Sequence, residues 1–389
     1  MEHTAPAILE IGIVLLVAAG AGWLARAAGL PAVVGYLAVG LVVSPFTPGY
    51  VADREQIQLL ADFGVVLLLF EVGIEVDLLR LRREQVGLLW AAPLQVVLTT
   101  AVAGGAAFAA GLDWFGAAIV GLSVALSSGV VIVNITRSRR RTTDAVTDRT
   151  LLGWSVLQDV TGVALAGVIL ALGESGGRPP ALALVGLALF GALAVVVAWL
   201  LPRLLVALRE QHDLFLTVTV ATGLAVAGIG SVVFAVPLAL AAFVSGLAIA
   251  ESPDAAEARR RLLPFRDLFA VLFFVAIGTL IDPAALSAGL PWLALVLITL
   301  VVGKVLVVYG LARLARLPAH PWQLAIGLGQ LGEFGFVLAS VALAAHAIGS
   351  EVYAAILAAV AVSIGISTVA VRLVRRAESA ATRQDKPAV

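Results

Sequence analysis

The sequence predicts an all-α, polytopic membrane protein with about thirteen transmembrane helices. Of its 389 residues, 61% are hydrophobic and only 13% are charged, and the mean hydropathy is +1.07. A soluble domain is about 45–50% apolar and about 25% charged. Long apolar segments also recur along the whole chain, with short connections between them. We therefore expect one membrane domain over residues 1–376 and a short cytoplasmic tail over 377–389.

The individual helices follow from the length needed to cross a bilayer, which is about 20 apolar residues and less where neighbouring helices protect the segment. The expected segments are 6–26, 30–45, 57–77, 85–111, 114–135, 150–173, 181–201, 213–229, 231–250, 262–281, 291–314, 321–347 and 351–374. The eighth and ninth are separated at Gly228–Gly230. The first has acidic leading residues and no clean small-residue cleavage site, so we interpret it as a retained helix rather than a signal peptide.

Basic residues mark alternate connections between these segments. They gather at 80–83, 137–141, 202–210, 257–261, 312–316 and 372–376. The other connections, 45–56, 112–113, 174–180, 282–290 and 348–350, contain only two basic residues, Arg54 and Arg178. Because Lys and Arg are retained on the cytoplasmic side of a membrane, this alternation predicts an outside N-terminus, a cytoplasmic C-terminus and an odd number of spans.

Composition and motifs exclude several classes of function. The chain has 25 Lys and Arg against 25 Asp and Glu, so no basic excess suggests a nucleic-acid partner. It has no Cys, which excludes disulfides and thiol catalysis, and its four His are too scattered to form a metal-ligand pair. No phosphate-binding loop, zinc-binding His motif or nucleophile elbow is present. We therefore predict a protein that is not an enzyme and has no cofactor.

Two matched polar interruptions suggest an internal repeat. Six segments lie on each side of the linking segment 181–201, and "VALSSGVVIV" at 124–133 and "GLGQLGEFGF" at 327–336 occupy the fifth place of each half. Both are rich in Gly or Ser within an apolar run. Broken helices at matched places of an inverted repeat are typical of a transporter with an ion site near the bilayer midplane.

Asp159, in "LLGWSVLQDVTGVALAGVILALG" at 151–173, is the main candidate for an ion site. A charge at the bilayer centre costs about 2.5–3.5 kcal/mol even on the lenient insertion scale, so its presence needs a reason. Gln158 precedes it and Ser155 lies one turn earlier, with Thr161 just beyond, which makes an oxygen-rich patch for a proton or a monovalent cation. The alternative is a structural carboxylate that pairs with a lysine or caps a broken helix.

Other polar residues of the apolar segments have two interpretations each. Ser127 and Ser128 provide oxygens at the first interruption or ease close helix packing. Lys304, the only lysine within a predicted span, either compensates charge on Asp159 or on a broken-helix end, or takes part in ion coupling. Gln330 and Glu333, in the second interruption, either satisfy unwound backbone or contact the ion.

A second group of charges lies nearer the basic ends of two helices. Glu71 and Glu75 share one face of the third segment, where pairing of Glu75 with Arg80 or Arg82 is expected and Glu71 is a possible accessory residue of the ion pathway. Arg266 and Asp267, inside the tenth segment, either line an inner vestibule or form a salt bridge.

These motifs resemble monovalent cation:proton antiporter family 2, in particular the Kef-type potassium/proton exchangers of the sodium/hydrogen exchanger superfamily. The matching motifs run in the family's order at 34–45, 67–78, 125–133, 151–165, 272–282 and 329–338. The resemblance covers about residues 5 to 376. Its most specific part is the Gln158–Asp159 pair with the downstream Gly-Gln-x-Gly-Glu-Phe.

The resemblance implies an inverted-repeat antiporter fold with two crossed broken helices, the fifth and the twelfth. It implies a homodimer in a bacterial cytoplasmic membrane, in which a core moves against a scaffold. The core would comprise about 85–173 and 291–374, and the scaffold about 6–77 and 213–281. Kef-type exchangers usually continue into a cytoplasmic nucleotide-binding domain, which does not follow here, so the resemblance implies no gating by glutathione or nucleotide unless that domain has been removed. A separate cytoplasmic regulatory subunit remains an alternative.

The expected activity is exchange of a monovalent cation for a proton by alternating access. Asp159 would hold either ion but not both, because the charge of the cation disfavours the protonated carboxyl. Related sodium exchangers often have two adjacent carboxylates, whereas the first position here is Gln158. This favours electroneutral exchange of K⁺ and leaves Na⁺ open. The alternatives are a channel-like cation uniporter and a non-transporting membrane sensor or subunit.

Overall fold

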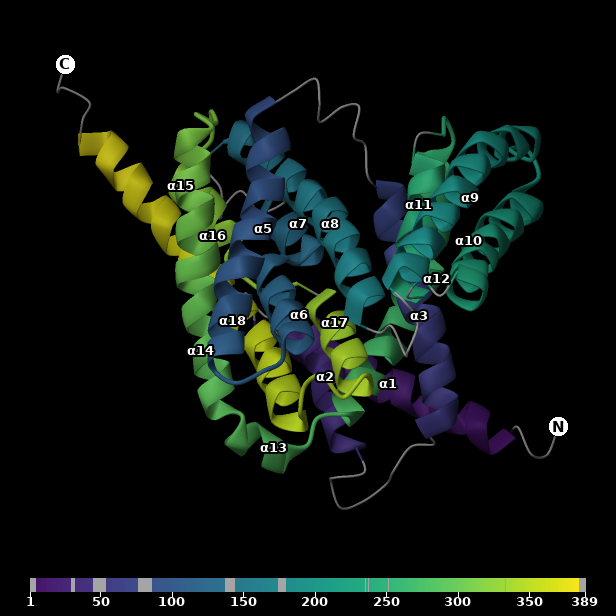
Figure 1. Cartoon of the computed structure of the whole chain (residues 1–389), viewed down its shortest axis with the longest axis horizontal. Coiled ribbons are helices and arrows are strands. Elements are labelled where there is room, and N and C mark those ends of the chain that lie inside the picture. The colour runs from purple at the N-terminus through teal and green to yellow at the C-terminus, as the bar shows by residue number, and fades with distance from the viewer. Residues whose placement is uncertain are drawn as a thin grey trace. The chain divides into compact units, whose positions relative to one another are not determined.

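The chain is almost entirely helical in the computed structural model (Figure 1). The structure describes residues 5–28, 32–44, 54–75, 86–136, 144–173, 180–234, 236, 238–250, 252–332 and 334–384. Its first part contains α1 (Ala5–Ala27), α2 (Ala32–Val42), α3 (Arg54–Glu75), α5 (Val86–Ala109), α6 (Trp114–Ala125), α7 (Gly129–Thr136), α8 (Ala145–Gly173) and α9 (Pro180–Ala207). Then follow α10 (His212–Phe234), α11 (Leu238–Ala250), α12 (Ala255–Thr279), α13 (Pro283–Ala288), α14 (Leu290–Leu300), the π-helical turn η1 (Val301–Val305), α15 (Leu306–Leu314), α16 (Pro321–Gly327), α17 (Phe334–Ala344) and α18 (Ser350–Gln384).

The predicted all-α polytopic membrane fold is confirmed. Each predicted segment contains at least one helix, and within the described residues eight helices are long and apolar enough to cross a membrane. Large apolar side chains are exposed on α1 and α9, for example Leu16 and Trp199, as expected for surfaces that face hydrocarbon rather than water. The total of thirteen spans and the orientation of the termini remain predictions.

The expected junction at Gly228–Gly230 is wrong. Helix α10 continues through both glycines to Phe234, and α11 begins only at Leu238. Gly230 serves packing instead, because a Cβ there would lie 2.6 Å from the Phe190 ring and 2.7 Å from Ala241. In this segment a glycine therefore marks a close helix contact and not the end of a helix.

Helix α8 begins earlier than predicted, at Ala145 rather than at residue 150. Asp144 is the reason, since its Oδ1 accepts hydrogen bonds of 2.8 Å from the backbone N–H groups of both Val146 and Thr147. Such a cap satisfies donors that have no partner within the helix. The first residues of α8, 145–149, are too polar to belong to the predicted apolar segment, but the cap stabilises them as helix.

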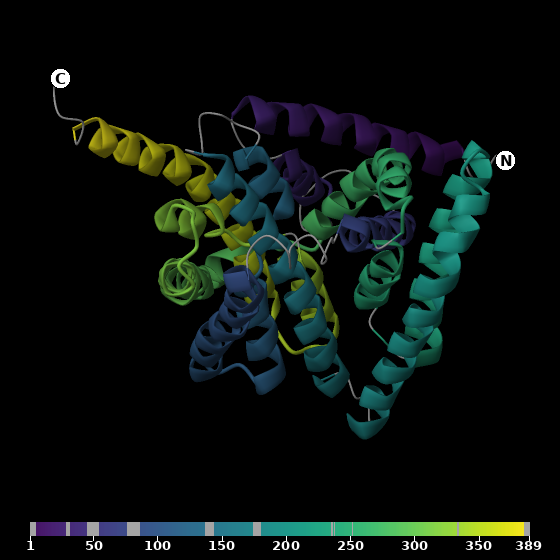
Figure 2. The same cartoon turned by 90° about the horizontal axis from the view of Figure 1, so that it is seen from above.

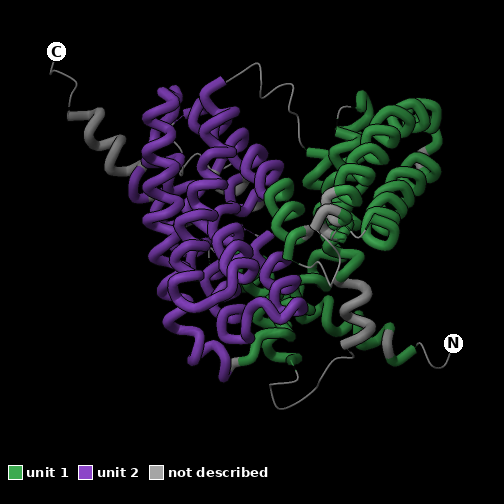
Figure 3. Tube along the Cα trace, viewed as in Figure 1, with its two compact units in different colours: residues 1–77, 163–282 green, residues 78–162, 283–389 purple. Residues whose placement is uncertain are grey.

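The chain forms two compact units (Figure 3). Unit 1 comprises residues 1–77 and 163–282, and unit 2 comprises 78–162 and 283–389. The division falls within α8, after Gly162. The expected core and scaffold ranges instead place the whole of 150–173 in the core, and their assignment remains a prediction.

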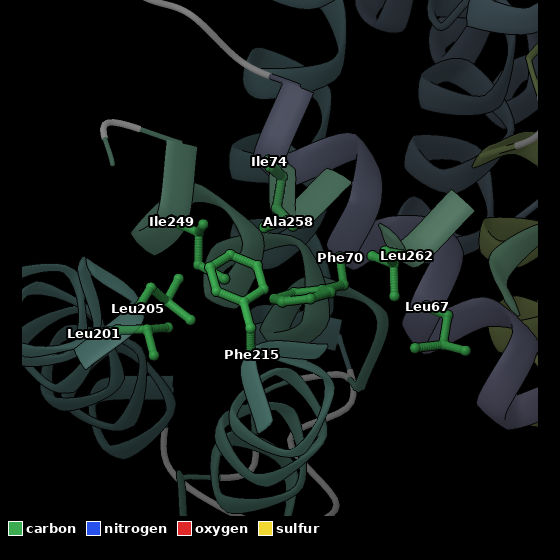
Figure 4. Close-up of a cluster of buried hydrophobic side chains, with 9 residues drawn as sticks. All are labelled: Leu67, Phe70, Ile74, Leu201, Leu205, Phe215, Ile249, Ala258 and Leu262. Atoms are coloured by element: carbon green, nitrogen blue, oxygen red, sulfur yellow. The ribbon is translucent and has the colours of Figure 1, made fainter. Parts of the chain in front are cut away.

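Unit 1 is built around α3, which packs against α11 and α12, while α2 packs against α1 and α12. Its larger hydrophobic cluster has the Phe215 ring at the centre, with Phe70 on one side and Leu205 on the other (Figure 4). Phe70 and Phe215 are each no more than 1% exposed. These contacts join α3, α9 and α10 into one core.

Close approach of α3 and α11 depends on a pair of glycines. A Cβ at Gly73 would overlap the Phe243 carbonyl oxygen and lie 2.9 Å from the Cα of Gly246, so neither helix has room for a side chain there. We expect Gly73→Ala to lower the free energy of unfolding by about 1–3 kcal/mol through overpacking. Gly228→Ala, where nothing lies within 4 Å of the added Cβ, should leave stability unchanged or raise it. Equal melting temperatures of the two purified variants would contradict this.

Unit 2 contains α5, α6 and the C-terminal helices. Helix α5 packs against α6 and against the run of α14, η1 and α15, as both views show (Figures 1 and 2). Helix α18 packs against α14, α16 and α17. All residues of the ion site predicted around Asp159 that the structure describes belong to this unit.

Candidate functional site

Both predicted helix interruptions are present. Residues 126–128 separate α6 from α7, and the non-helical stretch between α16 and α17 begins at Leu328. Glu333, predicted to lie in the second interruption, falls outside the described residues. Each break leaves backbone groups without their helical partners, so these groups must be satisfied by other parts of the protein.

The two breaks satisfy one another. Gly332 donates its backbone N–H to the Leu126 carbonyl at 3.0 Å, and Ser127 Oγ donates to the Leu328 carbonyl at 2.8 Å. A Cβ at Gly332 would lie 2.6 Å from the Ser127 carbonyl oxygen, so this approach requires glycine. The two interrupted helices therefore meet at their breaks, as the fold class predicted.

Ser128 and Gln330 add to this junction. Gln330 Nε2 donates to the Ser128 carbonyl at 3.4 Å, and Ser128 Oγ accepts from Val131 N at 3.4 Å in the first turn of α7. Gln330 is fully buried, and its Oε1 has no hydrogen-bond partner among the described residues. The junction thus holds a buried oxygen with unused capacity to accept.

Lys304 joins the two breaks. Its side chain is fully buried, and Nζ donates to the Leu126 carbonyl at 2.8 Å and to the Gln330 carbonyl at 2.6 Å, one from each break. These carbonyls lie just beyond the C-terminal ends of α6 and α16, where the helix dipole is negative and a cation is favoured. Lys304 also interacts electrostatically with Asp159. Lys304 therefore interacts with both of the groups considered from the sequence, the broken-helix ends and Asp159.

Lys304 lies in the π-helical turn η1, whose backbone pattern differs from that of α14 and α15 on either side. Single π-helical turns are rare and occur frequently at functional sites. Thr99 Oγ1 of α5 donates to the Gly303 carbonyl within this turn at 2.5 Å. This hydrogen bond ties the turn that carries Lys304 to α5.

Helix α8 brings Ser155, Gln158 and Asp159 into buried positions. They are 5%, 0% and 7% exposed, respectively. Gln158 Nε2 donates to Gln95 Oε1 at 2.5 Å, while Gln158 Oε1 is buried without a hydrogen-bond partner among the described residues. Thr161 Oγ1 donates to the Leu157 carbonyl at 2.7 Å within its own helix. Gln158 is therefore joined through Gln95 to the Ala125 carbonyl at the first break, and Asp159, the next residue, interacts electrostatically with Lys304.

Gln95, Thr99 and Trp154 are site residues that the sequence analysis missed. Gln95 Nε2 donates to Thr99 Oγ1 at 3.1 Å and to the Ala125 carbonyl at 3.2 Å, and Trp154 Nε1 donates to Gln95 Oε1 at 3.3 Å. All three side chains are fully buried. A signal existed, because Gln95 and Thr99 stand one helical turn apart within an apolar segment. Their partners come from distant segments and could not be inferred from that spacing.

Glu71 lies in unit 1, in a separate cluster of charges. It is 1% exposed and pairs with Arg259 at 2.5 Å and with Arg266 at 2.9 Å, both on α12. Glu75 also pairs with Arg259, at 2.8 Å, and Arg266 pairs with Asp267 at 2.9 Å. The expected partners of Glu75, Arg80 and Arg82, lie outside the described residues. The salt-bridge interpretation of Arg266 and Asp267 thus has direct geometric support.

We expect Glu71→Gln to lower the free energy of unfolding by about 3 kcal/mol, because Arg259 and Arg266 both lose their buried carboxylate partner. Glu257→Gln is a matched control, since Glu257 pairs with Arg260 and Arg261 of its own helix, α12. This control should cost less than about 1 kcal/mol. Thermal unfolding of the two purified variants in detergent measures the difference, and a similar loss in both would refute the structural role of Glu71.

Within the part of the chain that the structure describes, no group of three or more His, Cys, Asp or Glu could hold a metal ion. Among the described residues, the candidate site instead contains the Asp159 carboxyl, the Lys304 amine, and neutral amide, hydroxyl and carbonyl oxygens. Such a donor set suits reversible contact with a partly dehydrated monovalent cation or with a proton.

Comparison with known proteins gives the family. Residues 13–376 match the family model described as "Sodium/hydrogen exchanger, transmembrane". The protein YbaL of Escherichia coli (strain K12), whose name describes a cation/proton antiporter, is 31% identical over 400 residues, which cover 97% of this chain and 70% of YbaL. The glutathione-regulated potassium-efflux system protein KefC of Enterobacter sp. (strain 638) is 30% identical over 376 residues, covering 92% of this chain. The chain spans only 59% of the length of that KefC.

The fold has a solved relative. The structure of the sodium proton antiporter MjNhaP1 from Methanocaldococcus jannaschii at pH 8 matches with a TM-score of 0.73 and covers 96% of this chain and 99% of MjNhaP1. At 18% sequence identity, this similarity concerns the fold alone.

Proposed function

The chain belongs to the sodium/hydrogen exchanger family, and on this premise we propose that it is a secondary active antiporter that exchanges a monovalent cation for protons. The observation that carries the proposal is the buried Asp159 beside Lys304, whose ammonium group holds both helix breaks. A carboxylate buried within a membrane-spanning helix is costly, so its presence at this place favours a role in binding ions or protons.

In the proposed mechanism, Asp159 binds a proton or a cation in turn. An arriving cation favours the ionised carboxylate and releases the proton, and protonation releases the cation. Movement with an empty, ionised Asp159 is disfavoured because it would carry a buried charge without a compensating ion. Coupling follows from this competition, and it requires only that the site opens to one side at a time.

The neutral residue before Asp159 affects which cation the site would prefer. Gln158 adds an oxygen without adding a negative charge, which suits a one-for-one, electroneutral exchange. It also suits a cation that does not have to be fully dehydrated or bound by two carboxylates. We therefore favour K⁺ and keep Na⁺ as the alternative. The names of KefC, a potassium-efflux protein, and of MjNhaP1, a sodium proton antiporter, leave both cations possible within the family.

The wider setting follows the family resemblance. We propose a homodimer in the bacterial cytoplasmic membrane, with the C-terminus in the cytoplasm. Unit 2, which contains both breaks and Asp159, would form most of the moving core, and unit 1 most of the scaffold. A separate cytoplasmic regulatory subunit remains possible.

The test is a proton-linked flux assay in proteoliposomes that contain a pH-sensitive dye. Addition of K⁺, Na⁺, Li⁺ or Rb⁺, one at a time, should change the internal pH for at least one cation if the protein is an antiporter. Movement of the cation without a linked pH change would indicate a uniporter. Neither signal would indicate a sensor or subunit that retains the fold without transport.

A further inference from the structure

The carboxamide of Gln95 can adopt only one orientation in this structure. Its Oε1 lies 3.3 Å from Trp154 Nε1, and an indole N–H can donate but cannot accept. Its Nε2 lies 3.2 Å from the Ala125 carbonyl oxygen, which can accept but cannot donate. A donor-only group on one side and an acceptor-only group on the other therefore exclude the flipped amide.

The orientation of Gln95 determines that of Gln158. Because Gln95 presents an oxygen, Gln158 must present its Nε2 to it, at 2.5 Å. The other end of the Gln158 carboxamide, Oε1, is then turned away from Gln95. That oxygen is buried and has no hydrogen-bond donor among the described residues.

A buried acceptor without a donor destabilises the protein unless a ligand satisfies it. Amide oxygens are ordinary neutral ligands of hard cations. Gln158 directly precedes Asp159, the proposed shared carboxylate of the exchange. An oxygen at this place would contribute to cation binding without competing for the proton.

We propose that Gln95 is a positioning residue, which holds the Gln158 carboxamide with Oε1 directed away from Gln95 as a neutral ligand for the transported cation. This inference rests on the proposed function and specifies how its site binds the cation. Trp154 determines the polarity of the Gln95 amide. Thr99 anchors Gln95 to the rest of the site, because it accepts from Gln95 and donates to the Gly303 carbonyl in the turn that carries Lys304.

The test compares Gln95→Leu, Gln158→Leu and the double variant with the wild type in the proteoliposome assay. For the cation that drives flux in the wild type, we expect Gln95→Leu to raise the apparent KM about tenfold, equivalent to about 1.4 kcal/mol, with a much smaller change in maximal rate. Gln158→Leu should raise KM at least as much. The double variant should resemble Gln158→Leu, since both changes remove the same ligand.

A matched control separates positioning from packing. Gln323→Leu also removes a fully buried amide from unit 2, on α16 rather than on the helices α5 and α8 that carry Gln95 and Gln158. It should lower the melting temperature without raising KM. The inference is overturned if Gln95→Leu behaves like this control, or if its effect on KM multiplies with that of Gln158→Leu.

A second readout does not require transport. Titration with KCl or NaCl, against choline chloride at equal ionic strength, should raise the melting temperature of the wild type because a ligand stabilises the state that binds it. This shift should be reduced in Gln95→Leu and Gln158→Leu but not in Gln323→Leu. A wild type that binds but does not transport would refute the antiporter proposal alone. Equal shifts in all variants, or none in the wild type, would refute the role of Gln95.

Discussion

Replacement of Asp159 by asparagine is expected to reduce cation-driven proton movement to the level of protein-free liposomes. Asparagine has nearly the shape of aspartate but can neither bind a proton in exchange for a cation nor provide the negative charge that a cation requires. The protein should still fold, because Lys304 keeps its two carbonyl acceptors, Leu126 and Gln330, when the carboxylate is lost. The pH-dye assay and size-exclusion chromatography of the same preparation measure activity and folding together.

The control for this variant is Asp213→Asn, which removes a carboxylate from the exposed first turn of α10 in unit 1. It should transport at the wild-type rate. Full exchange by a monodisperse Asp159→Asn protein would remove Asp159 from the mechanism. Loss of exchange in both variants would instead point to a general effect of charge on reconstitution.

Much of the fold could be predicted because hydrocarbon imposes a simple rule on the chain. Segments near 20 apolar residues must be helical when the backbone has no water to bind, and each expected segment contains at least one helix. The rule fails where local interactions, rather than hydrophobicity, determine where a helix begins or ends. Gly228 and Gly230 look like a break but lie inside α10, and the cap by Asp144 extends α8 beyond its apolar part.

The candidate site could be predicted in its residue types but not in its partners. Asp159, Gln158 and Lys304 were conspicuous because polar groups in apolar segments are expensive. The sequence offered two partners for Lys304, and the structure contains both, a carbonyl from each break together with Asp159. The π-helical form of η1 and the hydrogen bond from Gln158 to Gln95 depend on tertiary packing, which spacing along one helix does not encode.

Lys304 connects the structural and the functional properties of the site. Its amine donates to a carbonyl of each break and interacts electrostatically with Asp159, the carboxylate proposed to exchange ions. Binding of a transported cation near Asp159 places a second positive charge in the same region. The lysine would therefore lower the affinity for the cation while it holds the breaks together, which is useful in a site that must release what it binds.

We expect Lys304→Met to lower the free energy of unfolding by about 3 kcal/mol, because the buried Gln330 carbonyl loses the Lys304 donor and the Leu126 carbonyl keeps only the Gly332 N–H. Exchange should fall as well, since the two breaks are no longer held at a fixed distance from Asp159. Thermal unfolding in detergent and the pH-dye assay measure the two effects separately.

Arg313→Met is the matched control, because Arg313 is an exposed cation on α15, within the same run of helix as Lys304. Its loss should change stability by less than about 1 kcal/mol and leave exchange intact. The effects of Lys304→Met on stability and on exchange distinguish a structural role of Lys304 from a role in ion coupling. A large loss of stability with normal exchange would make Lys304 purely structural, whereas normal stability with lost exchange would make it part of ion coupling alone. Because the Lys304 amine donates to both breaks and interacts electrostatically with Asp159, we expect both properties to fall together.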